Sequence, residues 1–533
     1  MGSSTRRQSW TERLRPLAPV AVLLAAQVVA LLSLRAVYPR FFYIDDKVAQ
    51  YIPAFREIGL QLRSGQLPAL NNPGLGMAGN FSADLQYGVR DPAHWLIAII
   101  VSSFEDLNAA GWFLNVLSTV IIGLGILTLL RIYGSTGALA VSAAAAASMS
   151  GCLLWIGAAW WPMTWAVGWL VWLWVGLAIT GWRGALVTGA ASWLLVGAGY
   201  PYALPFAFLL VTARVVEEIR LRGSRGLWRS DLVLRLGAGA AGAVASLPGL
   251  LMALIAQPFS QRSGGVFAGP VGNTGYFIPN FLDVLLPSPT LLPIVRLYDP
   301  SSDLALVPLT MTAVFAVPLL PLIVWRGWGR RPGDLIAVTM VVAALIATQL
   351  PEQVLSFRYS VRHLALTGVL IPVFVLLAAR GGLVVTRRRT LLAVASVAGA
   401  GLLAFLRTPT LADYHVLAAI TTFLALAAIL VIAAGSARLQ RVVAASVLIA
   451  AAATAPAFGA WASTAADRRV SISQGAEARD QPAIPFDPLR SWGTQVQEYA
   501  ARSPLVGQEQ TTVYRWLPGS ARGWDVLALQ GNA

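Results

Sequence analysis

The sequence has little charge, almost no cysteine and almost no lysine. Of its 533 residues only 12% are charged, whereas a soluble domain typically carries about 25%. One cysteine, Cys152, excludes a disulfide framework. Lys47 is the only lysine, so nearly every basic side chain is an arginine. The scarcity of charge excludes a chain of several ordinary soluble domains. The fold is therefore predicted mainly from the hydrophobic residues, which make up 57% of the chain.

Most of these hydrophobic residues lie in long runs. A run of about 20 residues is the length that an α-helix needs to cross the hydrocarbon core of a bilayer. We therefore expect an all-α polytopic membrane protein with about 13 transmembrane helices, the first of them between residues 17 and 34. The other spans are expected near Ile121, Ala145, Val171, Leu194, Leu209, Gly242, Val314, Val342, Val373, Val397, Leu424 and Ala450.

Arginine is unevenly distributed between the two sides of the membrane that this topology defines. The N-terminal segment and the linkers at Arg131, Arg183, 214–235, 326–331, 380–389 and 438–441 share one side. That side is rich in arginine, and its acids are Glu12, Glu217, Glu218, Asp231 and Asp334. Because cytoplasmic loops carry an excess of basic residues, we place the N-terminus in the cytoplasm and the C-terminus outside. The net charge of +15 is then a topology signal and not evidence for nucleic-acid binding.

This topology divides the chain into a transmembrane body, 1–462, and a short extracytoplasmic tail, 463–533. The first outer loop, 38–105, contains helical spacing of apolar residues over 46–62, which predicts an amphipathic helix. A second apolar element, 92–103, is too short to span. The cytoplasmic loops leave no room for an ATPase domain, and no GxxxxGK[ST] loop is present. The polar chemistry of the chain is therefore expected outside.

Asp45 and Asp46 follow the first span at the outer boundary of the membrane. A carboxylate there can act as a general base towards a hydroxyl group or can bind a divalent cation. Equally, an aspartate can simply cap the N-terminus of a helix. Adjacent residues on a helix point in different directions, so one carboxylate would act and the other would orient or cap.

Arg358 and Arg362 precede a predicted span on the outer side. Residues four apart share one face of a helix, and the guanidinium fork suits phosphate. The alternative is that these side chains only extend to the membrane interface. Arginines on the outer side are uncommon under the positive-inside rule, which favours a functional role. We predict that this pair binds a lipid-linked phosphate, with Lys47 as a further phosphate contact and His363 as a candidate substrate contact.

Several short motifs resemble one family of bacterial membrane proteins. Residues 46–55, DKVAQYIPAF, resemble the D-x-x-x-Q-Y-x-P start of YfhO-type proteins in the GT-C glycosyltransferase superfamily. The turn at 72–81, the DPAHWL segment at 91–96 and SFRYS at 356–360 resemble later elements of the family. The similarity covers roughly the first quarter of the chain, with the later part matching only in its pattern of spans. It departs from the family at Asp91-Pro92, where a small polar residue is expected.

The resemblance implies an inverting glycosyltransferase of the bacterial plasma membrane. Such an enzyme moves a sugar from a polyprenyl-phosphate donor to an envelope glycan, lipid or protein on the extracytoplasmic side. It implies Asp46, with Asp45 beside it, at the catalytic centre. If a metal takes part, Mg²⁺ or Mn²⁺ at these two carboxylates is the candidate, and no other cofactor is expected.

Further substrate contacts are less sharply indicated. The shared motif makes Gln50 and Tyr51 candidates, whereas Arg90 could bind phosphate or form a surface ion pair with Asp91. His94 is a candidate contact or an interfacial packing residue. Two other functions remain open: a transporter or flippase of a lipid-linked glycan, which would place charges deep inside the spans, and a non-catalytic envelope-assembly protein.

Overall fold

A computed structural model describes most of the chain between residues 17 and 434. The residues left out of that range are 38, 40, 44–45, 71–84, 136, 257–270, 273–277, 282, 287, 289, 292–305, 308–317, 352, 355–356, 359 and 410–411. Asp45, the predicted spans near Val314 and Ala450, and the predicted tail 463–533 lie outside the described residues.

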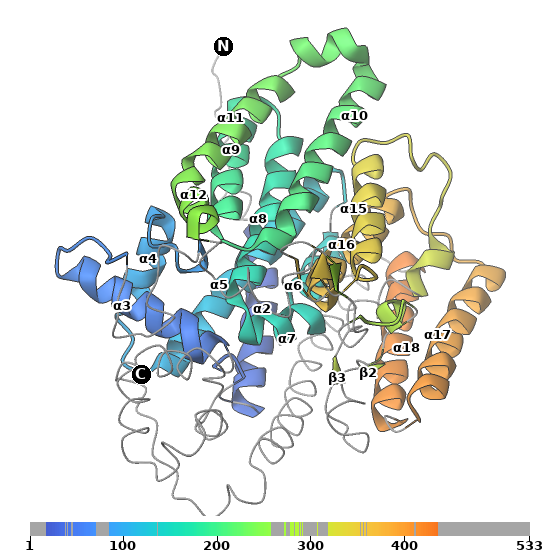
Figure 1. Ribbon diagram of the computed structural model, residues 1–533. Helices are drawn as coiled ribbons and strands as arrows, with labels where there is room; N and C mark the ends of the chain where they lie inside the picture. The colour runs from blue at the N-terminus through green and yellow to red at the C-terminus, as the bar shows by residue number, and fades with distance from the viewer. Residues whose placement is uncertain are drawn as a thin grey trace, which may run out of the picture.

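The described chain is almost entirely helical (Figure 1). Its first half contains α2 (Ala18–Val37), the π-helical turn η2 (Lys47–Tyr51), α3 (Ile52–Arg63), the 3-10 turn η4 (Leu85–Tyr87), α4 (Pro92–Val101), α5 (Leu107–Ile132), α6 (Gly137–Ser148), α7 (Gly151–Ala159), α8 (Trp161–Ala178), α9 (Gly181–Gly197), the 3-10 turn η5 (Pro201–Ala203), α10 (Leu204–Arg229), α11 (Leu232–Ala245) and α12 (Leu247–Ala256). The second half contains the 3-10 turns η8 (Asp283–Leu285), η9 (Leu320–Leu322) and η10 (Ser360–His363), with α15 (Asp334–Ala347), α16 (Leu364–Ala379), α17 (Arg387–Arg407) and α18 (Ala412–Ala434).

Two small antiparallel sheets accompany these helices. One pairs β1 (Val271–Gly272) with β4 (Gln353–Val354) and β4 with β5 (Phe357–Arg358). The other pairs β2 (Thr290–Leu291) with β3 (Leu306–Val307). The first sheet matters for the site because it sets the backbone immediately before η10.

Five of the described helical segments are long and apolar enough to cross a membrane: 18–36, 107–132, 161–178, 360–379 and 387–407. Shorter apolar helices accompany them. Every predicted span centre within the described residues falls inside a helix, from Ile121 in α5 to Leu424 in α18. The sequence prediction of a helical membrane protein is therefore confirmed, whereas the total of about 13 spans and their orientation stay predictions.

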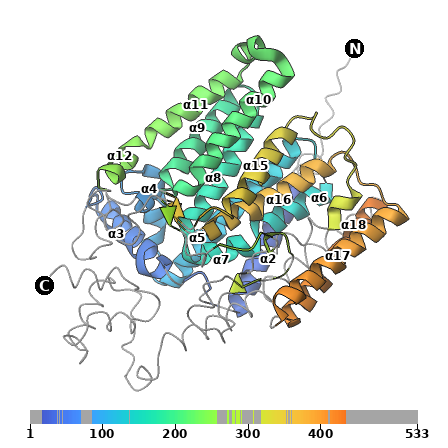
Figure 2. The same ribbon diagram turned by 45° about the vertical axis from the view of Figure 1, so that its right-hand side comes forward.

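The helices form one packed group with a hairpin at its side (Figures 1 and 2). Helix α9 packs between α8 and α11, α8 packs on α5, and α10 packs on α15, which packs on α16. Helices α17 and α18 pair with each other at one edge. Helix α17 exposes Leu391, Leu392, Leu402 and Leu406, a surface that suits hydrocarbon and not water.

The helix predicted over 46–62 is present as η2 followed by α3. Pro53 lies in the first turn of α3, where its missing N–H costs no hydrogen bond. The apolar face of α3 buries Ile52, Phe55 and Ile58. Helix α4 lies so close that a Cβ on Gly59 would come within 2.0 Å of the Ala98 carbonyl oxygen. The two helices α3 and α4 therefore form one unit.

The segment 214–235, expected as a linker, is mostly helical. Helix α10 continues to Arg229 with one break at Gly223, where φ is 74°. Ion pairs between helical neighbours run through it: Arg214 to Glu218 at 2.7 Å and Arg235 to Asp231 at 3.0 Å. The sequence placed 214–235 as a linker between spans and assigned it no secondary structure, and charges four apart stabilise the helices found there.

Candidate functional site

The π-helical turn η2 directs the only lysine inwards. The Lys47 side chain is fully buried, and its Nζ donates hydrogen bonds to Asn115 Oδ1 at 2.9 Å and to the Gly157 carbonyl at 2.6 Å. The ammonium group also lies 5.3 Å from the centre of the Phe42 ring. Burial lowers the pKa of Lys47 well below its usual value. Lys47 thus fastens the turn to α5 and α7.

Asp46, one residue earlier, is held by two donors. The indole Nε1 of Trp160 donates to Asp46 Oδ2 at 2.7 Å, and Gln50 Nε2 donates to Oδ1 at 3.3 Å. Trp160 stands between α7 and α8, with Pro162 in the first turn of α8. A short N–H···O⁻ contact is of the stronger, charge-assisted kind, so the carboxylate has a defined orientation although it is only half-buried.

Arg362 lies on the face of the same tryptophan. Its guanidinium carbon is 4.5 Å from the centre of the Trp160 ring and 5.4 Å from that of Tyr202, and Nη1 donates to the Tyr202 hydroxyl at 3.2 Å. Cation–π contacts of this kind hold a guanidinium plane without using up its donors. The structure therefore brings Asp46 and Arg362 together at Trp160, although they are far apart in the sequence.

Tyrosine and glutamine side chains surround this group. Tyr51 donates from its hydroxyl to Gln86 Oε1 at 2.6 Å, and the Tyr87 hydroxyl lies 3.4 Å from Gln50 Oε1. The rings of Tyr200 and Tyr202 stack at 4.8 Å. Burial raises the pKa of the Tyr200 hydroxyl, which keeps it protonated. The site thus combines one carboxylate and one guanidinium with neutral hydroxyl and amide groups.

Arg358 and Arg362 do not share a helix, contrary to the reasoning from their spacing. Arg358 lies in strand β5, whereas Arg362 lies in the 3-10 turn η10. His363, the next residue, is buried, with Nδ1 3.1 Å from the Ser360 carbonyl and its ring 5.5 Å from that of Tyr202. A phosphate-binding role for Arg358 stays a prediction, since its side chain lies outside the described residues.

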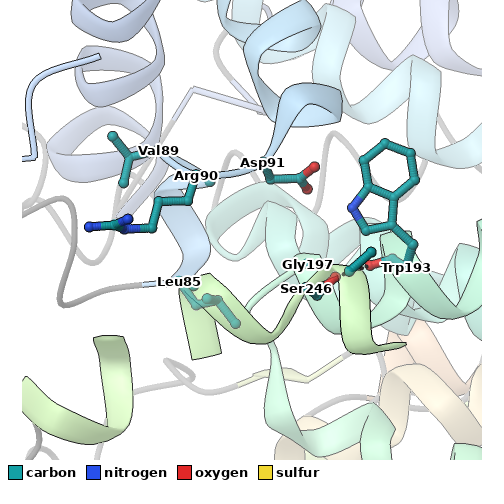
Figure 3. Close-up of a pocket in the computed structure, with 10 residues that line it drawn as sticks. Leu85, Val89, Arg90, Asp91, Trp193, Gly197 and Ser246 are labelled. Carbon is teal, nitrogen blue, oxygen red and sulfur yellow. Dashed lines mark hydrogen bonds between the residues drawn. The ribbon is translucent and has the colours of Figure 1, made fainter. Parts of the chain in front are cut away.

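Asp91 pairs with His94 and not with Arg90. His94 Nδ1 lies 2.6 Å from Asp91 Oδ2, and Asp91 Oδ1 accepts a hydrogen bond from the backbone N–H of Ala93 at 3.0 Å. Asp91 is thus the N-cap of α4, with Pro92 in the first turn. Arg90 is exposed and points away from the Asp91 carboxylate (Figure 3), while His94 packs against Phe55, Trp161 and Trp165.

The described residues do not form a metal site. No group of three or more His, Cys, Asp or Glu that could hold an ion occurs among them. Both oxygens of Asp46 accept hydrogen bonds from N–H donors, whereas Mg²⁺ requires oxygen ligands in an octahedral arrangement. Binding of Mg²⁺ or Mn²⁺ at Asp45 and Asp46 stays a prediction.

Three residues that contact the candidate site were not predicted from the sequence: Tyr202, Asn115 and Gln86. Tyr202 and Asn115 lie within predicted spans or their ends, where polar groups are readily interpreted as packing. A signal was nevertheless present for Asn115, because an amide inside an apolar helix is expensive unless it has a partner. For Tyr202 and Gln86 the sequence offers no such signal, since their partners are distant in the chain.

Comparison with known proteins places the fold. No family model matches the chain, and no curated protein matches it. The crystal structure of ArnT from Cupriavidus metallidurans bound to undecaprenyl phosphate is similar, with a TM-score of 0.52 and 13% identity over 90% of this chain and 82% of ArnT. The archaeal oligosaccharyltransferase AglB from Archaeoglobus fulgidus, in complex with an inhibitory peptide and a dolichol-phosphate, gives a TM-score of 0.41 and 13% identity over 96% of this chain and 61% of AglB.

The likeness to ArnT establishes a shared fold. It extends over most of both chains, and at 13% identity it concerns the fold alone. Together with the apolar helices, it indicates a helical membrane protein that resembles ArnT in fold.

Proposed function

We propose that this chain is a glycosyltransferase that moves a sugar from a polyprenyl-phosphate donor to an acceptor outside the cytoplasm. The observation that carries the proposal is Trp160, whose N–H holds the Asp46 carboxylate and whose ring face holds the Arg362 guanidinium. The proposed base and the proposed phosphate-binding group therefore both contact a single residue, Trp160. The fold shared with ArnT, a protein solved with undecaprenyl phosphate, supports the choice of donor.

In the proposed reaction Asp46 is the general base. It takes the proton of an acceptor hydroxyl as the oxygen forms a bond to the anomeric carbon of the donor sugar. The bond between that carbon and the phosphate oxygen breaks, and its electron pair leaves with the polyprenyl phosphate. A single displacement of this kind inverts the anomeric centre. A positioned base contributes about 10²–10⁴-fold to the rate.

Arg362 stabilises the charge that develops on the leaving phosphate. Its contacts with Trp160 and Tyr202 fix the guanidinium plane before the donor arrives. Hydrogen-bond donors that are already in place need little reorganisation during the reaction, and each contributes about 10²–10³-fold to the rate. Arg358 is a second phosphate contact in this proposal. Gln50 and Tyr51 are substrate contacts beside Asp46 in this proposal. Hydrogen bonds with Tyr87 and Gln86 hold their side chains in place.

Lys47 has a positioning role in this proposal. Its Nζ is bound to Asn115 and Gly157 in the interior, and the side chain is fully buried. Because Asp46 directly precedes Lys47, the buried lysine sets where the carboxylate stands relative to Trp160. We further propose that the enzyme lies in a bacterial plasma membrane, that the site faces outwards, and that the acceptor is an envelope glycan, lipid or protein.

Purified protein in nanodiscs, supplied with a radiolabelled polyprenyl-phosphate sugar and an envelope extract as acceptor, tests the proposal. Asp46→Asn should lower kcat by about 10²–10⁴-fold, and Arg362→Lys should lower kcat/KM for the donor by about 10²–10³-fold. Matched controls on the same side are Asp106→Asn, the exposed cap of α5, and Arg63→Lys, whose Nη1 donates to the Ser102 carbonyl.

The control variants should retain wild-type rates. If Asp46→Asn also retains its rate, Asp46 is not the base. If no sugar transfer occurs while the protein moves the labelled lipid between leaflets, the flippase alternative replaces the enzyme. If Asp46→Asn still supports envelope assembly in cells that depend on this protein, a non-catalytic docking role is favoured.

A further inference from the structure

A surface rich in arginine lies at the end of α16 that is remote from the candidate site. Helix α16 begins directly after Arg362 and His363 and ends at Ala379. At 1.5 Å per residue its 16 residues extend about 24 Å, and the segment 360–379 is long and apolar enough to cross a membrane. We therefore expect this surface on the opposite face of the membrane from Asp46, the face predicted to be cytoplasmic.

Two segments, 320–333 and 380–391, form this arginine surface. They lie side by side because Ile323 and Leu383 form an antiparallel bridge, flanked by backbone hydrogen bonds of 2.8 and 3.0 Å. The Nη1 of Arg389 adds a hydrogen bond to the Ile323 carbonyl at 2.9 Å. Side chains from two separate parts of the chain are thus presented together.

The first segment has a fixed backbone. Asp334 Oδ2 accepts hydrogen bonds from the backbone N–H groups of Gly329 at 2.8 Å and Arg331 at 3.2 Å. The ring of Trp328 packs on that of Phe374 in α16, with the ring centres 5.8 Å apart. Because the turn is already ordered, a ligand that binds there pays little for ordering it.

The positive charge of the arginine surface is not balanced by nearby acids. Asp334, which follows the first segment, is buried and paired with Arg380 at 2.6 Å. Four arginines of the two segments are exposed and form no ion pair within the described part of the chain: Arg326, Arg330, Arg387 and Arg388. By contrast, Arg214 and Arg235 on the same predicted side pair with acids. The surface therefore attracts an anion.

Apolar side chains border these arginines. Helix α17 exposes Leu391 and Leu392 within its first two turns, and Trp325 is 41% exposed in the first segment. The helix is one of those long and apolar enough to cross a membrane. A small inorganic anion would leave this apolar border uncovered, whereas a phospholipid carries a phosphate and acyl chains in the same molecule.

We infer that the arginine surface binds an anionic phospholipid in the leaflet opposite to the candidate site. Its phosphodiester lies at the arginines, because the guanidinium fork matches phosphate oxygens, and its acyl chains lie along α17. Trp325 has the position that tryptophan favours, at the level of the headgroups. Basic surfaces between membrane helices on this side suit anionic headgroups. The inference does not depend on the proposed transferase function.

Photolabelling of the full chain tests the inference. The protein is placed in phosphatidylcholine nanodiscs with a trace of phosphatidylglycerol that carries a diazirine on one acyl chain, close to the glycerol. Mass spectrometry should find the label on 320–333 or 383–395. Unlabelled phosphatidylglycerol should displace it, whereas added phosphatidylcholine and inorganic phosphate at the same concentration should not.

Replacing three exposed arginines of the surface by glutamine should weaken binding. Each basic residue near an anionic lipid surface adds roughly fivefold to the affinity, so the triple variant should lower the label there by about 10²-fold. The same three positions changed to lysine should retain most of the label, since lysine binds phosphate as a point charge. The positions are Arg326→Gln, Arg330→Gln and Arg387→Gln.

The matched control removes three exposed arginines from elsewhere on the same predicted side and should label as the wild type does. Its substitutions are Arg183→Gln, Arg220→Gln and Arg225→Gln. An equal loss of label in the two glutamine variants would assign the binding to net charge and overturn the inference. Arg362→Gln should also keep the label, whereas its loss there would place the probe in the site at Trp160.

Two outcomes with the wild type alone would also overturn the inference, so it does not depend on the folding of any variant. Displacement of the label by inorganic phosphate would show a site for a free anion. Label confined to segments other than 320–333 and 383–395 would show that the lipid binds elsewhere.

Discussion

Replacing Trp160 by phenylalanine isolates one hydrogen bond of the candidate site. The change removes the indole N–H that donates to Asp46 Oδ2 at 2.7 Å but keeps an aromatic ring beneath Arg362. A hydrogen bond to a charged group is worth about 1.5–3 kcal/mol. Its loss disfavours the carboxylate and leaves the protonated acid nearly unaffected.

The pH dependence of activity should change, because only the ionised form of Asp46 loses stabilisation. If Asp46 is the base, activity in the variant should be lost at a higher pH than in the wild type as the solution is acidified. Since about 1.4 kcal/mol corresponds to one pH unit, the acidic limb of log(kcat) against pH should move up by about 1–2 units. The donor KM should change little, because a ring face remains for Arg362.

The assay is a pH series of kcat in nanodiscs, with Trp161→Phe measured in parallel. Trp161 is fully buried and donates to the Leu114 carbonyl at 3.1 Å, so its loss tests stability without touching Asp46. The control should leave the acidic limb in place. An unmoved limb in Trp160→Phe, with wild-type kcat, would refute the assignment of this N–H to the reacting carboxylate.

Two further substitutions test the supports of the site and of the fold. Lys47→Met keeps the length of the side chain but removes its donors to Asn115 and Gly157, and kcat should fall more than KM changes. Because burial lowers the pKa of Lys47 in the folded state, the unfolded chain binds the extra proton, so the wild type should gain thermal stability relative to Lys47→Met as pH rises towards 10.5, the usual value. A parallel pH dependence in the two proteins would contradict this. Arg380→Ala leaves Asp334 buried without its 2.6 Å ion pair and should cost about 3 kcal/mol in thermal unfolding, whereas the exposed Arg388→Ala should not. Equal melting curves for these two variants would show that the pair is not a support.

The helices could be predicted from the sequence because they depend on local composition. Runs of apolar residues place α5, α8 and α16 without knowledge of any partner, since the length needed to cross a bilayer is the same for each. The helix over 46–62 was also predictable from the spacing of Ile52, Phe55 and Ile58. The helical conformation of the charged linker 214–235 was not predicted, although Arg214 and Glu218 have the spacing of a helical ion pair.

The candidate site was predictable only in its parts. Asp46 and Arg362 could each be selected by residue type and side of the membrane, but their meeting at Trp160 depends on how α8, η2 and η10 pack. The shared helix expected for Arg358 and Arg362 failed for a similar reason. Strand β5 forms through pairing with β4, and β4 also pairs with β1 some 80 residues earlier in the chain, a contact that local spacing does not encode.

The burial of Lys47 has a practical consequence. Since it is the only lysine and its side chain is fully buried, an amine-reactive reagent meets a chain whose single side-chain amine is concealed. Acylation of Lys47 then requires the turn that carries Asp46 to open. The rate of that modification therefore reports how often this turn opens, and under the proposed function a bound donor or acceptor should slow it.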